Sequence, residues 1–115
     1  MGTGHASIKG QNEEFREYKM KARAMEWIDR RSGRLIEIAK TIWSHPELAM
    51  EEYRSSAILA DELERQGFDV ERGVAGMPTA FVATWGSGSP TIGFICEYDA
   101  LPGLSNTEKT FVRLT

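Results

Sequence analysis

The sequence predicts an α/β fold in which two helices precede about three strands, and in which the sheet is incomplete. Apolar residues recur at helical spacing in the first half of the chain, whereas short apolar runs rich in β-branched and aromatic residues follow in the second half. With 115 residues, the chain is shorter than the roughly 150 residues of an average domain. Two strands that are apolar on both faces need covering layers on both sides, and two helices supply only part of these layers. We therefore expect a piece of a larger domain.

A first helix is predicted from about Asn12 to residue 44. Asn12 is a suitable N-cap residue, and acidic side chains follow it in the first turn. One face of the helix carries the apolar residues Ile28, Leu35, Ile38 and Ile42. The helix is expected to end at His45, because the residue before a proline avoids the α-helical conformation. His45 itself is expected to interact with the last carbonyl groups of the helix and not to bind a metal.

A second helix is predicted from Glu51 to Gln66. The acidic side chains of Glu51 and Glu52 suit the positive end of its dipole, and Arg65 suits the last turn. Gly67 follows directly and is expected to end the helix in the left-handed conformation that glycine adopts easily.

Three extended segments are predicted after this helix, at 68–71, 80–85 and 91–96. The first alternates between polar and apolar residues, as a half-exposed strand does, and the other two are nearly continuous apolar runs. The Gly-Ser-Gly-Ser-Pro stretch at 86–90 lacks the lysine of a phosphate-binding loop, so it is interpreted as a hairpin turn. Cys96 lies in the third apolar run and is expected to be a small buried side chain. Trp27, Trp43 and Trp85 are expected to be core or interface anchors.

Composition and charge exclude several classes of protein. No apolar run approaches the roughly 20 residues of a membrane-spanning helix, and residues 1–11 lack the apolar centre of a signal peptide. One cysteine in the whole chain favours a reducing compartment, which we take to be the cytoplasm. Residues 1–44 hold nine Lys and Arg against six Asp and Glu, and residues 45–115 hold five against eleven. The sequence pI of 5.4 and the mixture of charges on the first helix argue against nucleic acid as a partner and favour a solvated helix face.

Two carboxylates at the end of the third apolar run are the candidate site. Glu97 and Asp99 stand two residues apart, directly before a Pro-Gly turn. On an extended backbone this spacing points both side chains to one side, where they could share a metal ion or orient its histidine ligands. Ligand sites of open α/β sheets lie at such carboxyl ends of strands. The alternative is a polar strand end that is simply solvated, which is the usual place of Asp and Glu.

Several stretches of the sequence resemble one known family, the metal-dependent amidohydrolases and carboxypeptidases that include the aminoacylases. The similarity runs from about residue 24 to residue 105 and is strongest to the p-aminobenzoyl-glutamate hydrolase branch. Its strength lies in the length of the run and not in one short motif. The stretches that carry it are 42–48, 62–71, 72–88, 92–94 and 97–105.

The resemblance implies an N-terminal piece of a zinc-peptidase-like catalytic domain. Residues 12–105 would be the partial catalytic domain, residues 1–11 a disordered leader, and residues 106–115 a disordered tail unlike the family. In the wider family a His-x-Asp pair occupies the places of Glu97 and Asp99, with the His as a metal ligand. Asp99 would therefore orient a metal ligand, and Glu97 is the candidate metal residue. The substrate-binding residues are unknown.

The resemblance also implies a function. Such enzymes hydrolyse an amide bond of an N-acyl or N-aroyl amino acid with zinc or manganese, and a glutamate acts as the general base. The Gly-His-x-Cys-Gly-His segment that supplies metal ligands in this branch does not occur in the sequence. This chain is therefore expected to bind no metal by itself and to be inactive alone. The resemblance leaves open whether the complete enzyme is a homo- or a hetero-oligomer. The alternative function is a non-catalytic interaction module that pairs through an exposed sheet edge.

Overall fold

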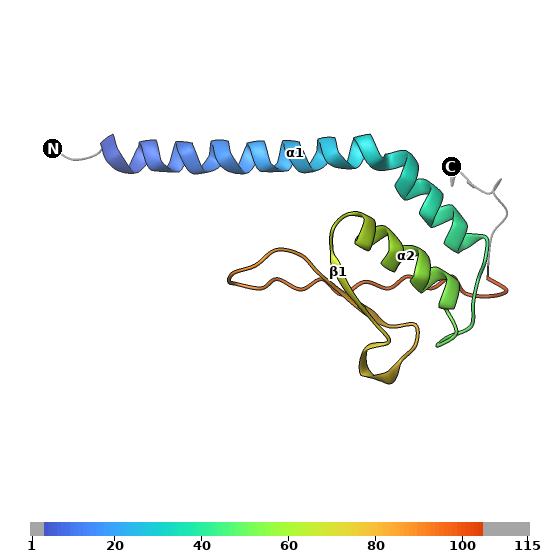
Figure 1. Cartoon of the computed structure of the whole chain (residues 1–115). Helices are drawn as coiled ribbons and strands as arrows, with labels where there is room; N and C mark the ends of the chain where they lie inside the picture. Colours follow the sequence, from blue (N-terminus) through green and yellow to red (C-terminus); the bar gives the residue numbers. More distant parts are fainter. Residues whose placement is uncertain (1–3, 105–115) are drawn as a thin grey trace, which may run out of the picture. The chain divides into compact units, whose positions relative to one another are not determined.

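The computed structural model of the chain describes residues 4–104, with side chains from residue 10 onward. Its elements in order are α1 (Gly4–Trp43), α2 (Tyr53–Arg65), β1 (Asp69–Arg72), the short 3-10 helix η1 (Val74–Gly76) and β2 (Phe81–Thr84) (Figure 1). Two helices followed by an antiparallel two-stranded sheet confirm the α/β class. The chain divides into two compact units, of which the first ends at Ile36 and the second begins at Glu37.

The first unit is the greater part of α1. This helix begins at Gly4, eight residues before the expected start, so it includes residues 4–11, for which the sequence predicts a disordered leader. Those residues contain no proline, and extending an existing helix adds one hydrogen bond for each residue fixed. The expected tail at 106–115 lies outside the described residues.

Charged side chains on α1 form exposed ion pairs along the helix. Lys21 Nζ lies 2.6 Å from Glu17 Oε1, and an Arg30 nitrogen lies 3.5 Å from Glu26 Oε1. All four side chains are mostly exposed, so each pair contributes only about 0.3–0.5 kcal/mol. These pairs agree with the solvated helix face predicted from the charge pattern.

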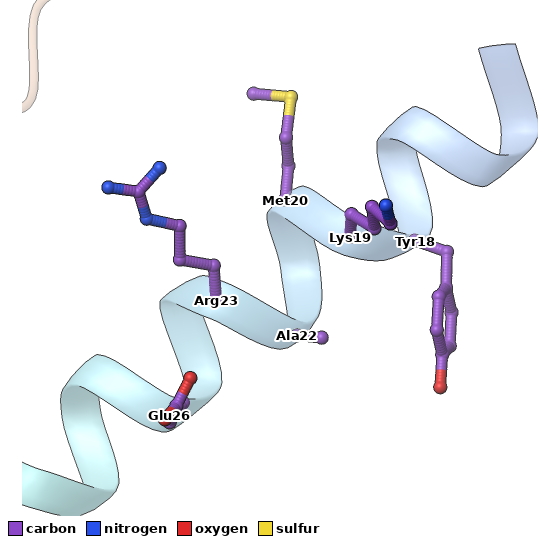
Figure 2. Close-up of a pocket in the computed structure, with 6 residues that line it drawn as sticks. All are labelled: Tyr18, Lys19, Met20, Ala22, Arg23 and Glu26. Carbon is purple, nitrogen blue, oxygen red and sulfur yellow. The ribbon is translucent and has the colours of Figure 1, made fainter.

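A hollow on α1 is lined by one helix alone (Figure 2). Met20 and Arg23 extend from one side of the helix and Tyr18 from the opposite side. Ligand sites surround most of their ligand, usually with groups from several elements. This hollow is therefore ordinary space between exposed side chains. The lining residues are Tyr18, Lys19, Met20, Ala22, Arg23 and Glu26.

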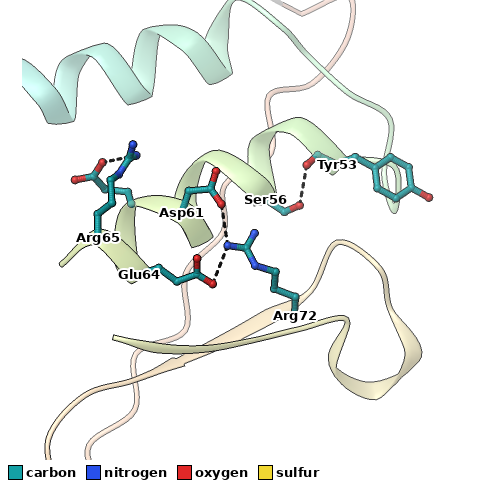
Figure 3. Close-up of polar contacts among 7 residues, drawn as sticks. Tyr53, Ser56, Asp61, Glu64, Arg65 and Arg72 are labelled. Carbon is teal, nitrogen blue, oxygen red and sulfur yellow. Dashed lines mark hydrogen bonds and ion pairs between the residues drawn. The ribbon is translucent and has the colours of Figure 1, made fainter. Parts of the chain in front are cut away.

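In the second unit α2 packs against the β1–β2 hairpin. The two strands pair in antiparallel register, with Asp69 opposite Thr84 and Arg72 opposite Phe81. Arg72 also joins the hairpin to the helix, because one of its terminal nitrogens lies 2.8 Å from Asp61 Oδ1 and 3.0 Å from Glu64 Oε1 (Figure 3). Since a single guanidinium bridges two carboxylates on successive turns of α2, it fixes the orientation of β1 along that helix.

The core of the second unit is thin. Among the described side chains, the buried apolar ones are Ile38 and Ala60. The other residues of the apolar face predicted for the first helix differ in burial. Ile42 is half-buried, whereas Ile28 and Leu35 are exposed. The three tryptophans are exposed as well, with Trp85 at 71%, so the expectation that they anchor a core is corrected.

The end of α2 follows the sequence prediction. Gly67 adopts a positive φ of 90°, and its N–H donates to the Glu64 carbonyl at 2.9 Å. The next N–H, of Phe68, donates to the Leu63 carbonyl at 3.1 Å. These two bonds define the Schellman motif, which satisfies carbonyl groups that would otherwise lack a partner.

Replacing Gly67 by alanine is expected to destabilise the second unit by about 1–2 kcal/mol, because a Cβ in the left-handed region clashes with its own backbone. Chemical denaturation followed by circular dichroism measures the effect. Gly33 is the matched control, since it lies inside α1 and nothing stands within 4 Å of the position that a Cβ would take. Gly33→Ala is expected to raise helix content, and equal losses in both variants would contradict the assignment.

The third predicted strand does not form. Residues 85–100 contain no strand, and the chain only bends at 88–90, so the expected hairpin turn at 86–90 joins no strand pair. A strand needs a partner for its N–H and C=O groups, and the described residues offer 91–96 none. The apolar side chains of this run therefore remain in solvent: Ile92 is 75%, Phe94 87% and Ile95 102% exposed.

Candidate functional site

Glu97 and Asp99 lie on the segment that follows this uncovered run. Burial alternates along it, because Glu97 and Asp99 are exposed while Tyr98 and Ala100 are half-buried. Alternation with a period of two is typical of an extended chain that rests one face on a surface. Both carboxylates are therefore exposed, on either side of the half-buried Tyr98. That they share one face stays a prediction from their spacing.

The inward side chain between them is held by two contacts. The Tyr98 hydroxyl donates a hydrogen bond to the Thr79 carbonyl. Its ring lies against Phe81 of β2, with 6.2 Å between the ring centroids and 30° between their planes. Tyr98 thus attaches the site segment to the start of β2, a role that the sequence analysis did not assign.

Thr79 is itself fixed from the other side. Thr79 is only 5% exposed, and its hydroxyl donates a hydrogen bond to Glu52 Oε2 at 3.0 Å. The second oxygen of Glu52 accepts the Met50 N–H at 3.0 Å. Hydrogen bonds from the N–H groups of Glu52 and Met50 and from the Thr79 hydroxyl hold the pKa of the Glu52 carboxyl below its ordinary value, although desolvation opposes the shift.

The described residues do not fit a complete metal site. No group of three or more His, Cys, Asp or Glu side chains within residues 10–104 is arranged to hold a metal ion. Structural and catalytic zinc sites take three or four protein ligands, whereas Glu97 and Asp99 supply two carboxylates. Any metal at this position needs ligands besides those of the described part of the chain.

Two other expected roles have different outcomes. His45 Nδ1 lies 2.9 Å from the Thr41 carbonyl oxygen, which confirms its predicted contact with the end of α1. Cys96 is exposed, and the expectation of a buried thiol is corrected. Its run was expected to lie inside a sheet, and without covering layers its side chains face water.

The N-terminus of α2 depends on a residue that the sequence analysis did not select. Glu47 accepts the N–H groups of Arg54 at 2.8 Å and Ser55 at 2.9 Å, and the Ser55 hydroxyl at 2.7 Å. Burial by itself would raise the pKa of Glu47, but the hydrogen bonds from Ser55 and Arg54 outweigh it and lower this pKa. Glu51 and Glu52, expected at this end, precede the first residue of the helix, and Glu52 makes no side-chain cap hydrogen bond there.

Comparison with known proteins shows that the chain is similar to a p-aminobenzoyl-glutamate hydrolase subunit, a dipeptidase and a carboxypeptidase, which are metallopeptidases and amidohydrolases. This confirms the resemblance seen in the sequence. The chain is 50% identical over 72 residues to one of the subunits of the p-aminobenzoyl-glutamate hydrolase of Escherichia coli, covering 63% of this chain and 15% of that protein. It is 38% identical over 100 residues to human Xaa-Arg dipeptidase, covering 76% of this chain and 23% of the relative.

A third relative extends the comparison to an archaeon. Thermostable carboxypeptidase 1 of Saccharolobus solfataricus is 38% identical over 79 residues, covering 67% of this chain and 20% of that protein. The chain thus spans between 15% and 23% of the length of these relatives. No family model matches the sequence. Within the described residues, no helix has the length and apolar character needed to cross a bilayer.

Proposed function

We propose that this chain forms one edge of the active site of a metal-dependent amidohydrolase. The reaction class is hydrolysis of the C–N amide bond of an N-acyl or N-aroyl amino acid, such as p-aminobenzoyl-glutamate. The observation that carries the proposal is the exposure of Glu97 and Asp99 on either side of Tyr98, in a chain that is 50% identical over 72 residues to a p-aminobenzoyl-glutamate hydrolase subunit. Paired carboxylates at the end of an extended segment are suited to holding or orienting metal ligands.

The two carboxylates have different proposed roles. Asp99 orients a metal ligand, and Glu97 stands at the place of a metal ligand. The metal is zinc or manganese, and it supplies an activated water when bound. Because the described residues bring no third ligand to the pair, the chain alone is expected to show no hydrolysis. The location is the cytoplasm, and an oligomeric assembly is supported by the Escherichia coli relative, whose name describes it as one subunit of a hydrolase.

A chimera tests the proposal. Residues 24–105 of this chain replace the corresponding region of the Escherichia coli relative, and hydrolysis of p-aminobenzoyl-glutamate is measured with zinc or manganese. The chimera is expected to be active, and Asp99→Asn in it is expected to lower activity by about 10–100-fold, as loss of an orienting partner does. Glu97→Gln is expected to lower both activity and the metal content found after dialysis.

Glu71→Gln is the matched control, because Glu71 is an exposed carboxylate on β1 and has no proposed role. Its chimera should keep full activity and metal content. An active chimera in which Asp99→Asn and Glu97→Gln also behave like the parent would contradict the proposal.

The alternative function is a non-catalytic interaction module, and the exposed apolar run at 91–96 favours it. Zinc titration of the chain together with candidate subunits separates the two. Metal binding tighter than about micromolar that is lost in Glu97→Gln or Asp99→Asn supports the hydrolase. The affinity of a site to which this chain adds two carboxylates falls when one of them is removed. A stable complex with another subunit and no metal binding supports the module.

A further inference from the structure

A half-buried tyrosine, Tyr98, separates the two exposed carboxylates. In extended chain, successive side chains point to opposite faces. Tyr98 faces inward, where its ring meets Phe81 and its hydroxyl donates to the Thr79 carbonyl. Glu97 and Asp99, which precede and follow Tyr98, are both exposed. While Tyr98 is held there, an extended backbone would direct both carboxylates away from it.

The anchor point of Tyr98 is itself tied to α2. Thr79 is buried, and its hydroxyl binds the Glu52 carboxylate next to the first residue of that helix. A continuous series of contacts therefore joins the start of α2, the loop before β2 and the site segment. The aromatic contact holds Tyr98 by packing, and the hydrogen bond adds a directional restraint that a ring alone would not provide.

We infer that Tyr98 is the positioning residue of this site, which through Thr79 and Phe81 sets the face on which Glu97 and Asp99 present their carboxylates. This inference rests on the proposed function for its meaning in catalysis. Its physical content, the orientation of the segment, can be measured without any hydrolysis.

Nitroxide labels on the full chain test the inference. In a Cys96→Ser background, single cysteines are placed by Glu97→Cys, Asp99→Cys or Ala100→Cys, and each label's collision rate with a soluble nickel chelate is measured. Labels at 97 and 99 are expected to collide several-fold more often than the label at 100. Tyr98→Phe, which keeps the ring and loses the donated hydrogen bond, is expected to reduce that contrast about twofold or more, given the usual contribution of one hydrogen bond. Tyr98→Ala is expected to abolish it.

Two controls separate positioning from general stability. Tyr53→Phe removes the hydroxyl of an exposed tyrosine and should leave the contrast unchanged. A label at Asp69→Cys on β1 should keep its mobility in every Tyr98 variant. If the contrast is absent in the parent, or persists in both Tyr98→Phe and Tyr98→Ala, the inference is overturned. A contrast that depends on Tyr98, together with a chimera indifferent to Asp99→Asn, overturns the proposed function and leaves the positioning role standing.

Discussion

Glu47→Ala is expected to destabilise the second unit by about 2 kcal/mol, the upper range for removing a helix N-cap. The carboxylate accepts two backbone N–H groups and one hydroxyl at the start of α2. Without it, N–H groups in the first turn lose their partners, and the buried Ser55 loses the acceptor of its hydroxyl. Urea denaturation followed by far-ultraviolet circular dichroism measures the loss.

Glu51→Ala is the matched control for this substitution. Glu51 is an exposed acid near the same helix end, whereas Glu47 is half-buried. Removal of Glu51 is expected to change the free energy of unfolding by no more than about 0.5 kcal/mol, as for most surface positions. If Glu51→Ala costs as much as Glu47→Ala, the stabilisation comes from charge near the helix dipole and not from the hydrogen bonds of Glu47.

The same carboxylate predicts a pH dependence. The pKa of Glu47 is lowered in the folded chain from its ordinary value of 4.5, so the unfolded chain binds the proton more readily. The contribution of Glu47 is thus complete above pH 4.5 and is lost as the pH falls through the lower folded-state value. Glu47→Gln should be less stable than the parent at neutral pH, and the difference should shrink under acid. Glu52, whose pKa is also lowered, contributes acid sensitivity of the same sign to that variant.

Local signals explain which parts of the fold could be predicted. The second helix and its end at Gly67 depend on neighbours within a few residues, and the structure has them within two residues of the prediction. The cap of the same helix depends on Glu47, seven and eight residues from its partners. The sequence analysis chose Glu51 and Glu52 because they directly precede the helix. Sequence distance alone does not show that the loop brings the carboxylate of Glu47 back to the N–H groups.

The third strand shows a different limit. The apolar run at 91–96 has the composition of a strand that is covered on both faces. Composition shows only that such a strand needs neighbouring strands and covering layers, and not that they are present. Whether it becomes a strand depends on partners, and the described chain provides none at this position. The site shows the same limit. The exposure of Glu97 and Asp99 agrees with the usual place of acidic side chains, whereas the Tyr98 contacts to Thr79 and Phe81 join residues 17 to 19 positions apart and have no local signature.

The uncovered run makes self-association the second large expected effect. Residues 91–96 hold no charge and no proline, and Ile92, Phe94 and Ile95 are exposed. Uncharged apolar segments with strand-forming side chains and open backbone groups pair readily with other chains. The chain is therefore expected to associate at about micromolar concentrations and above, the range in which such exposed segments aggregate.

Ile95→Lys is expected to weaken this association by at least about tenfold. It removes the burial of an isoleucine side chain, worth about 1.5–3 kcal/mol, and adds a charge that opposes edge-to-edge pairing. Sedimentation velocity over a concentration series measures the effect. Trp85→Lys is the matched control, because it adds the same charge at another exposed apolar residue outside the run. If both variants associate like the parent, the 91–96 segment is not the contact, and if both dissociate alike, net charge and not strand pairing controls the association.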